Sequence, residues 1–139
     1  VIVVIGSRER SADLPENIID IGRVENQTEL ARYYSIADLS VITSKKETFS
    51  MPVAESLCCG TPVAGFMSGG PESIAIAEYS DFAEYGDVDG LERLIKNRMK
   101  KKTDKTEIAP QAKEKYSKQR MTAEYMNIYR NLLNTEGHE

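Results

Sequence analysis

Five short apolar segments rich in β-branched residues recur along the chain, and segments with helical periodicity separate most of them. The apolar segments are residues 1–5, 18–21, 39–43, 62–66 and 82–85. Their length and composition predict strands, and the wholly apolar first segment predicts a strand that is buried on both faces. Strands that alternate with helices form parallel sheets with right-handed crossovers. The pattern therefore predicts a Rossmann-like α/β fold of three layers, with a parallel sheet between flanking helices.

The segments between the strands carry residues that commonly begin or end helices. The expected helices are Thr28 to about Ile36, Thr48 or Ser50 to Gly60, 72–78 after Pro71, one from Asp87 or Asp89 with Leu91, Leu94, Ile95 and Met99 as its apolar stripe, and finally 107–117 and 121–134. Tyrosines at helical spacings, namely Tyr33, Tyr34, Tyr125 and Tyr129, are interpreted as core or interface residues. The connection over 7–17 is short and polar, so we expect a loop or a single turn there.

The composition is that of one globular domain. Of the 139 residues, 40% are hydrophobic and 29% are charged, which is ordinary for a soluble protein with a real core. The net charge of −4 argues against nucleic acid as a partner, and no apolar run is long enough to span a bilayer. Cys58 and Cys59 are adjacent, which is not a metal-binding or redox spacing. We expect two buried apolar side chains there, and a cytoplasmic location.

The segment 47–55 (ETFSMPVAE) places one carboxylate before, and another inside, the start of an otherwise apolar helix. A charge in such a helix is costly unless it has a partner. The helix start offers unpaired N–H groups and a positive dipole end, which suit a phosphate. Glu55 can accept both hydroxyls of a ribose, and Glu47 a hydroxyl of a second sugar. The spacing alone favours simple capping over a ligand site, because the dipole favours Glu near any helix start.

Ligands of parallel α/β sheets bind at the carboxyl ends of the strands, so the loops that follow the strands are candidates too. These loops are residues 6–8, 22–24, 43–50 and 67–72. Gly69 and Gly70 can let backbone amides approach a phosphate or sugar, although Gly-Gly-Pro is also an ordinary strand-to-helix turn. Arg23 can meet a phosphate or a base, or simply be solvated. The basic run 96–105 can touch anionic lipid headgroups, but it is also typical of a solvated helix end.

Several spaced motifs resemble one family. Residues 45–75 (KKETFSMPVAESLCCGTPVAGFMSGGPESIA) resemble the donor-binding region of retaining glycosyltransferases of the GT-B fold, in the large group 1 (GT4-type) family. The matching positions are Glu47, Phe49 and Glu55, then 59–63 (CGTPV) and 69–72 (GGPE), in the family's order. Residues 17–24 and 30–44 resemble the preceding strand–helix–strand, and 116–133 the closing helices. Ser50 stands where the family usually has Gly, and we interpret it as a tolerated small capping residue.

The resemblance implies a reaction and roles for residues. The implied reaction transfers a sugar from a nucleotide-diphosphate sugar to an acceptor hydroxyl, with the anomeric configuration retained. Glu55 would bind the ribose, and Glu47 would contact the transferred sugar and take part in catalysis. The other candidate donor-binding residues are Thr48, Phe49, Ser50, Met51, Gly22, Arg23, Val24, Gly69 and Gly70. No cofactor and no metal are expected, because helix ends and basic side chains would stabilise the leaving diphosphate.

The chain opens on a predicted core strand without an initiator methionine. We therefore expect residues 1–139 to be one nucleotide-sugar-binding domain, shortened at its N-terminus, of a longer protein. The N-terminal acceptor-binding domain would be missing, and the parent can make peripheral contact with the inner face of a membrane. A fragment of this kind should be inactive alone. Two alternatives stay open: a non-catalytic α/β binding or interaction domain, and a GT-B nucleotide-sugar epimerase.

Overall fold

The computed structural model describes residues 1–7 and 13–135. Strands and helices alternate along most of this part of the chain. The elements are β1 (Ile2–Ile5), β2 (Ile18–Gly22), α1 (Gln27–Ile36), β3 (Ser40–Ile42), α2 (Met51–Cys58), β4 (Val63–Phe66), α3 (Pro71–Ile74), a 3₁₀ helix (Ala77–Tyr79), β5 (Ser80–Ala83), α4 (Val88–Lys100), α5 (Lys105–Lys115) and α6 (Lys118–Thr135). All the strand pairs are parallel, so the predicted parallel α/β fold is confirmed.

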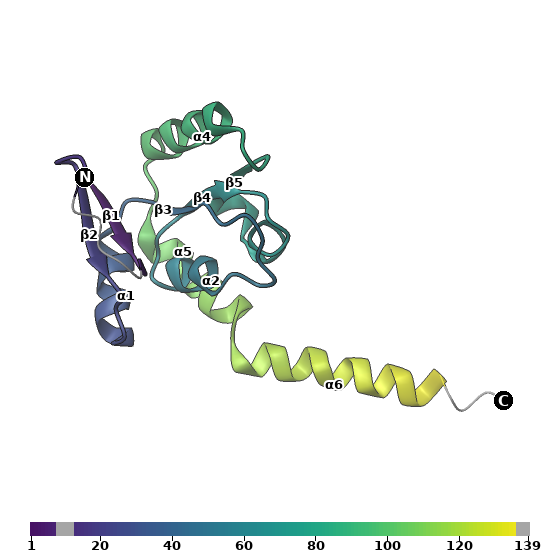
Figure 1. The fold of residues 1–139 in the computed structure, drawn as a ribbon. Helices are drawn as coiled ribbons and strands as arrows, with labels where there is room; N and C mark the ends of the chain where they lie inside the picture. The colour runs from purple at the N-terminus through teal and green to yellow at the C-terminus, as the bar shows by residue number, and fades with distance from the viewer. Residues whose placement is uncertain (8–12, 136–139) are drawn as a thin grey trace.

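The strands form two sheets instead of one. β1 pairs with β2, and β3, β4 and β5 form a separate sheet in that order. Figure 1 shows the β1–β2 pair beside the three-stranded sheet, with α1 next to it. The prediction that β1 is buried on both faces is wrong, since Ile2, Val3 and Val4 are all exposed. An apolar run indicates a strand, but its burial depends on the elements that cover it, and among the described strands β1 pairs with β2 alone.

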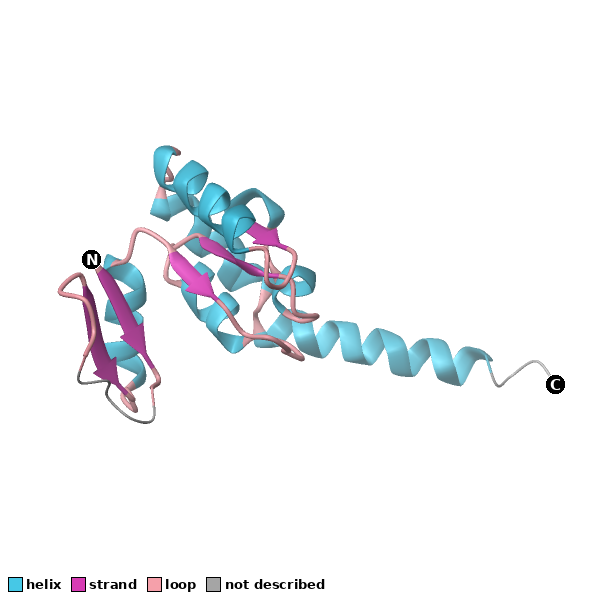
Figure 2. Cartoon of the chain, turned by 45° about the horizontal axis from the view of Figure 1, so that its top comes forward, coloured by secondary structure: helices cyan, strands magenta, loops and turns pink. Residues whose placement is uncertain are grey.

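The three-stranded sheet is the middle layer of the molecule. β4 is its central strand and is buried throughout. On one side, Val63 packs with residues of α2 and α5, including Leu57 and Ile108, in the main core. On the other side, Ala64 packs with Phe66 and Leu91 in a second cluster beneath α4. Neighbouring residues of β4 therefore serve opposite faces, and the predicted three layers are present around this sheet (Figure 2).

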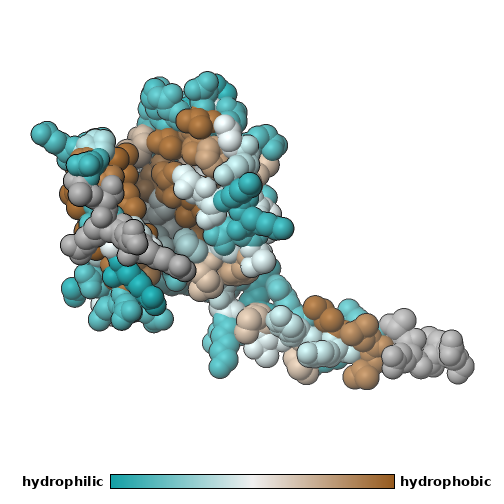
Figure 3. All heavy atoms as spheres, viewed as in Figure 1, coloured by the Kyte–Doolittle hydropathy of each residue, from teal (hydrophilic) through white to brown (hydrophobic). Residues whose placement is uncertain are grey.

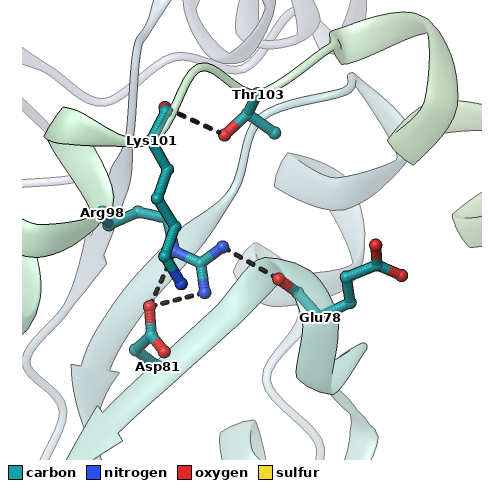
Figure 4. A network of polar contacts seen from close by, with 5 residues as sticks. All are labelled: Glu78, Asp81, Arg98, Lys101 and Thr103. Atoms are coloured by element: carbon teal, nitrogen blue, oxygen red, sulfur yellow. Dashed lines mark hydrogen bonds and ion pairs between the residues drawn. The ribbon is translucent and has the colours of Figure 1, made fainter.

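α4 is joined to β5 by a partly buried ion pair that the apolar stripe did not predict (Figure 4). The Arg98 side chain is only 4% exposed, and its Nη2 lies 2.5 Å from Asp81 Oδ2. Arg98 Nε donates to the same oxygen at 2.7 Å, and Nη1 donates to the carbonyl of Glu78 at 2.9 Å. Met99, which was predicted to be on the buried stripe, is 54% exposed. The stripe predicted from spacing is correct at Leu91 and wrong at Met99. Arg98, next to Met99, takes the buried position because its guanidinium pairs with the Asp81 carboxylate on β5.

Several helix boundaries differ from the prediction. Asn26, not Thr28, caps α1, because its side chain accepts from the amides of Thr28 and Glu29. The predicted helix over 72–78 is divided into the short α3 and the 3₁₀ helix, and β5 begins at residue 80 instead of 82. The last two helices begin at residues 105 and 118, earlier than predicted. Cys58 and Cys59 are half-buried, not fully buried.

α6 extends away from the rest of the molecule (Figure 1). Its large apolar side chains are exposed, and Figure 3 shows apolar atoms along it. These residues are Met121, Tyr125, Met126, Ile128, Tyr129, Leu132 and Leu133. Tyr125 and Tyr129 are therefore not core residues of this chain. In the part of the chain that the structure describes, no helix combines the length and apolarity needed to cross a bilayer.

Candidate functional site

Two of the loops that the sequence singled out meet beyond the ends of β3 and β4. The backbone of Glu47 forms a parallel bridge with Gly69, and the Glu47 amide donates to the carbonyl of Ser68 at 3.0 Å. This bridge lies at the carboxyl edge of the three-stranded sheet, since β3 ends at residue 42 and β4 at residue 66. Strand order predicts that all four loops converge, and this is confirmed for segments 43–50 and 67–72. Segments 6–8 and 22–24 instead follow β1 and β2, which form the separate two-stranded sheet.

Gly69 and Gly70 make this close approach possible. A Cβ on Gly70 would lie 2.8 Å from the carbonyl carbon of Thr48 and 2.9 Å from the amide nitrogen of Phe49. Gly69 has a φ of +102°, which favours glycine. Its amide donates to Glu72 Oε1 at 2.8 Å. This packing role needs no ligand, and the predicted contacts of both glycines with a donor stay predictions.

Glu72 closes the turn between β4 and α3. Its second carboxylate oxygen accepts from the amide of Ser68 at 3.0 Å. Although burial acts in the opposite direction, hydrogen bonds from backbone amides lower the pKa of the Glu72 carboxyl. The carboxylate thus holds in place the turn against which the Glu47 segment packs.

Ser50 begins α2 in an unusual conformation. Its φ of 69° and ψ of 74° place it in the left-handed region, and its side chain makes no capping hydrogen bond. The prediction that Ser50 acts as a side-chain cap is therefore wrong. The residue is 2% exposed, and its Oγ finds no hydrogen-bond partner among the described residues. The positive φ gives a physical reason why a glycine suits this position.

Glu55 lies in the second turn of α2 and is half-buried. The hydroxyl of Tyr34, on α1, donates to Glu55 Oε2 at 3.2 Å. Burial first, and then the negative charge and hydrogen bond of Glu55, raise the pKa of the Tyr34 phenol, so this hydroxyl keeps its proton. The Glu55 carboxylate, which the sequence indicated would need a partner, therefore has one within the protein, the Tyr34 hydroxyl. The sequence interpretation placed Tyr34 in the core or an interface and missed this contact, because the two residues are 21 positions apart.

The remaining candidate residues lie around the same edge or on the smaller sheet. Thr48, Phe49 and Met51 are exposed next to the half-buried Glu47. Arg23 is also exposed, and its Nε lies 3.5 Å from Glu25 Oε1, so the structure shows a solvated ion pair there.

The loops of the smaller sheet also meet each other. Gly22 has a φ of +78°, and its carbonyl accepts from the amide of Gly6 at 2.8 Å. Its amide donates to Asp20 Oδ1 at 2.8 Å, an oxygen that also accepts from the Ser7 hydroxyl. Val24 follows in a half-buried position. Arg8, in the first predicted loop, lies outside the described residues.

The arrangement combines the features of an anion and hydroxyl site. A half-buried carboxylate lies one turn inside α2, and a second precedes that helix. The positive end of the helix dipole lies between them, although Pro52 has no N–H and the Val53 amide already donates to the carbonyl of Ser50 at 3.1 Å. Across residues 1–7 and 13–135, no group of three acidic, histidine or cysteine side chains gathers in a way that could hold a metal ion.

Two solved structures have a fold similar to that of this chain. It superimposes on sucrose-phosphate synthase from Thermosynechococcus elongatus with a TM-score of 0.66 and 22% identity, over 86% of this chain and 31% of that one. It also superimposes on HepE from Anabaena, solved in complex with UDP, with a TM-score of 0.61 and 17% identity, over 84% and 32% of the two chains. The fold is that of a domain of GT-B glycosyltransferases.

Sequence comparisons identify the family. Residues 3–115 match the family described as "Glycosyl transferases group 1", so the chain belongs to the group 1 glycosyltransferases, as its motifs indicated.

Two curated relatives are similar to this chain in sequence. The chain is 24% identical to an N-acetyl-alpha-D-glucosaminyl L-malate synthase of Bacillus anthracis over 129 residues, which are 89% of this chain and 33% of the relative. A stretch of 56 residues, 38% of this chain and 13% of the relative, is 46% identical to a D-inositol 3-phosphate glycosyltransferase of Thermobispora bispora. The chain therefore spans a third or less of the length of these relatives.

Proposed function

We propose that this chain is the donor-binding domain of a retaining glycosyltransferase, and that it binds a nucleotide-diphosphate sugar at the carboxyl edge of the β3–β4–β5 sheet. The observation that carries the proposal is the position of Glu55, a half-buried carboxylate one turn inside α2. It lies within the part of the chain that matches the family. The UDP in one protein of similar fold supports a nucleotide as the ligand.

The proposed contacts follow the order of the chemical groups along α2. The carboxylate of Glu55 accepts from the two ribose hydroxyls, since a carboxylate offers about four acceptor positions. The start of α2, around Ser50 and Met51, binds the diphosphate. Glu47 accepts from a hydroxyl of the transferred sugar and takes part in catalysis, while Thr48 and Phe49 line the same subsite. This arrangement uses no metal and no cofactor, because the helix start stabilises the leaving diphosphate.

Further parts of the proposal concern the residues near the base and the phosphates, the acceptor-binding domain and the location of the parent protein. Gly22, Arg23 and Val24 would lie near the base, and Gly69 and Gly70 near the phosphates or sugar. An N-terminal domain of the parent protein would bind the acceptor. We place the parent in the bacterial cytoplasm, in polysaccharide synthesis, with peripheral contact to the inner membrane face.

Calorimetry and kinetics on the full-length protein test these roles. Glu55→Gln should weaken the binding of UDP or GDP, whichever the wild type binds, whereas Glu29→Gln, on the exposed side of α1, should leave it unchanged. Glu47→Ala should lower kcat more than it weakens donor binding. Unchanged affinity in Glu55→Gln would remove the ribose role, and no binding of either nucleotide would favour a non-catalytic binding domain. A product that is the epimerised donor, with no transfer to an acceptor, would indicate an epimerase.

A further inference from the structure

The Tyr34–Glu55 hydrogen bond joins two helices at the proposed ribose site. Tyr34 Oη donates to Glu55 Oε2 at 3.2 Å, and both side chains are half-buried. A glutamate side chain has several rotatable bonds, and fixing them costs free energy when a ligand binds. A neighbour that fixes the carboxylate before the ligand arrives removes part of that cost.

The backbone that carries Tyr34 is held in place by other elements. Its carbonyl accepts from Thr61 Oγ1 at 2.6 Å, and Thr61 is fully buried after α2. Lys105, at the start of α5, donates from Nζ to the carbonyls of Ser35 at 2.7 Å and Ala37 at 2.6 Å. The end of α1 is therefore attached to the segment that follows α2 and to the first residue of α5.

The backbone that carries Glu55 is equally well held. The neighbouring Ser56 is fully buried, and its Oγ lies 2.9 Å from the carbonyl of Thr61 and 2.7 Å from Ser40 Oγ. The two supports share Thr61, whose hydroxyl binds the α1 end and whose carbonyl binds the α2 serine. With both backbones fixed in this way, the orientation of the carboxylate is the main remaining freedom, and the Tyr34 hydroxyl restricts it.

We propose that Tyr34 is a positioning residue for the nucleotide: its hydroxyl orients the Glu55 carboxylate so that the remaining acceptor positions face the ribose diol. A carboxylate has about four acceptor positions, of which Tyr34 occupies one and the diol needs two. The tyrosine and the ribose therefore do not compete. The inference rests on the proposed ribose role of Glu55, and it adds a residue from α1, outside the 47–55 segment, to the donor site.

The test compares nucleotides with and without the ribose hydroxyls. Wild type, Tyr34→Phe, Tyr33→Phe and Glu55→Gln variants of the full-length protein are titrated with UDP and with 2′,3′-dideoxy-UDP, and with the corresponding GDP pair. Tyr34→Phe should weaken binding of the ribonucleotide by about two- to tenfold, the effect of leaving one side chain to be ordered by the ligand. Its affinity for the dideoxynucleotide should equal that of wild type. The matched control Tyr33→Phe should leave both affinities unchanged.

The outcomes separate the two proposals. A loss confined to the ribonucleotide in Tyr34→Phe, with a larger loss in Glu55→Gln, supports the positioning role. Suppose that Glu55→Gln removes the preference for the ribonucleotide. If Tyr34→Phe then keeps the full wild-type preference, or weakens the binding of both nucleotides equally, Tyr34 is only structural and the inference fails. If Glu55→Gln itself retains the preference for ribose, or no nucleotide binds, the proposed function fails and the inference falls with it. The dideoxynucleotide affinity also reports whether each variant is folded.

Discussion

Replacing Ser50 with glycine should stabilise the chain, although most substitutions of buried residues destabilise proteins. Two features of Ser50 act against the folded state. Its φ of 69° is in the left-handed region, which costs a residue with a Cβ about 1–2 kcal/mol. Its Oγ is buried without a hydrogen-bond partner among the described residues, and such a group costs about 1–3 kcal/mol.

The gain is smaller than these two costs together. Glycine loses more backbone entropy on folding, by about 0.5–1 kcal/mol, and the removed side chain leaves a small void because Ser50 is only 2% exposed. The expected net effect is an increase of about 1–3 kcal/mol in the free energy of unfolding. Ser50→Ala, which removes the hydroxyl but keeps the Cβ, should give a smaller increase because the backbone strain remains.

Urea denaturation followed by far-UV circular dichroism measures both variants. The midpoint should rise in the order wild type, Ser50→Ala, Ser50→Gly, and the denaturant slope should be unchanged, as expected for a change in stability alone. A Ser50→Gly variant less stable than wild type would refute the strain argument. Equal stability of the two variants would show that the left-handed conformation costs no more than the extra backbone entropy that glycine loses, about 0.5–1 kcal/mol.

Three further predictions concern contacts away from Ser50. Gly70→Ala should shift the NMR amide signals of residues 47–50, because its Cβ would lie 2.8 Å from the Thr48 carbonyl carbon; unchanged signals would contradict the packing of the two loops. Arg98→Met should lower the free energy of unfolding, measured by urea denaturation, by about 2–4 kcal/mol. The expected loss is somewhat smaller than for a fully buried ion pair because the Asp81 side chain is 28% exposed. A loss below about 1 kcal/mol would show that the pair contributes no more than an ion pair on the surface. Burial, and then the nearby Cys58, raise the pKa of Tyr116 to about 12 from its ordinary value of about 10. Its neutral form is thus favoured by folding, so its contribution to stability is complete below pH ~10 and is lost as the pH rises toward ~12. Tyr116→Phe should reduce that alkaline loss, and an identical pH dependence in the variant would exclude Tyr116 as its source.

The loop convergence was predictable from the sequence because it depends on strand order. Parallel strands place the segments after β3 and β4 at one edge, and the Glu47–Gly69 bridge forms there. The motif around Glu55 was also visible, since a lone carboxylate among apolar helix residues is conspicuous. Both conclusions need only local patterns and the rule that connects parallel strands.

The features that the sequence did not reveal depend on distant partners or on backbone angles. Tyr34 and Arg98 both lie on helices whose spacing indicates an apolar face, and periodicity does not show that a carboxylate lies opposite. The exposure of β1 depends on which elements cover it, and not on its own residues. At Ser50 the family's usual glycine was noted, but its physical reason, a positive φ, is visible only in the structure.

A crystal structure of the full-length protein with its nucleotide diphosphate bound is the most direct test of the proposed donor site. The account predicts both ribose hydroxyls within about 2.5–3.0 Å of the Glu55 carboxylate oxygens, with the phosphates at the start of α2. Tyr34 should keep its hydrogen bond to Oε2 in that complex. A nucleotide bound away from the carboxyl edge of the β3–β4–β5 sheet, or a ribose that does not contact Glu55, would contradict it.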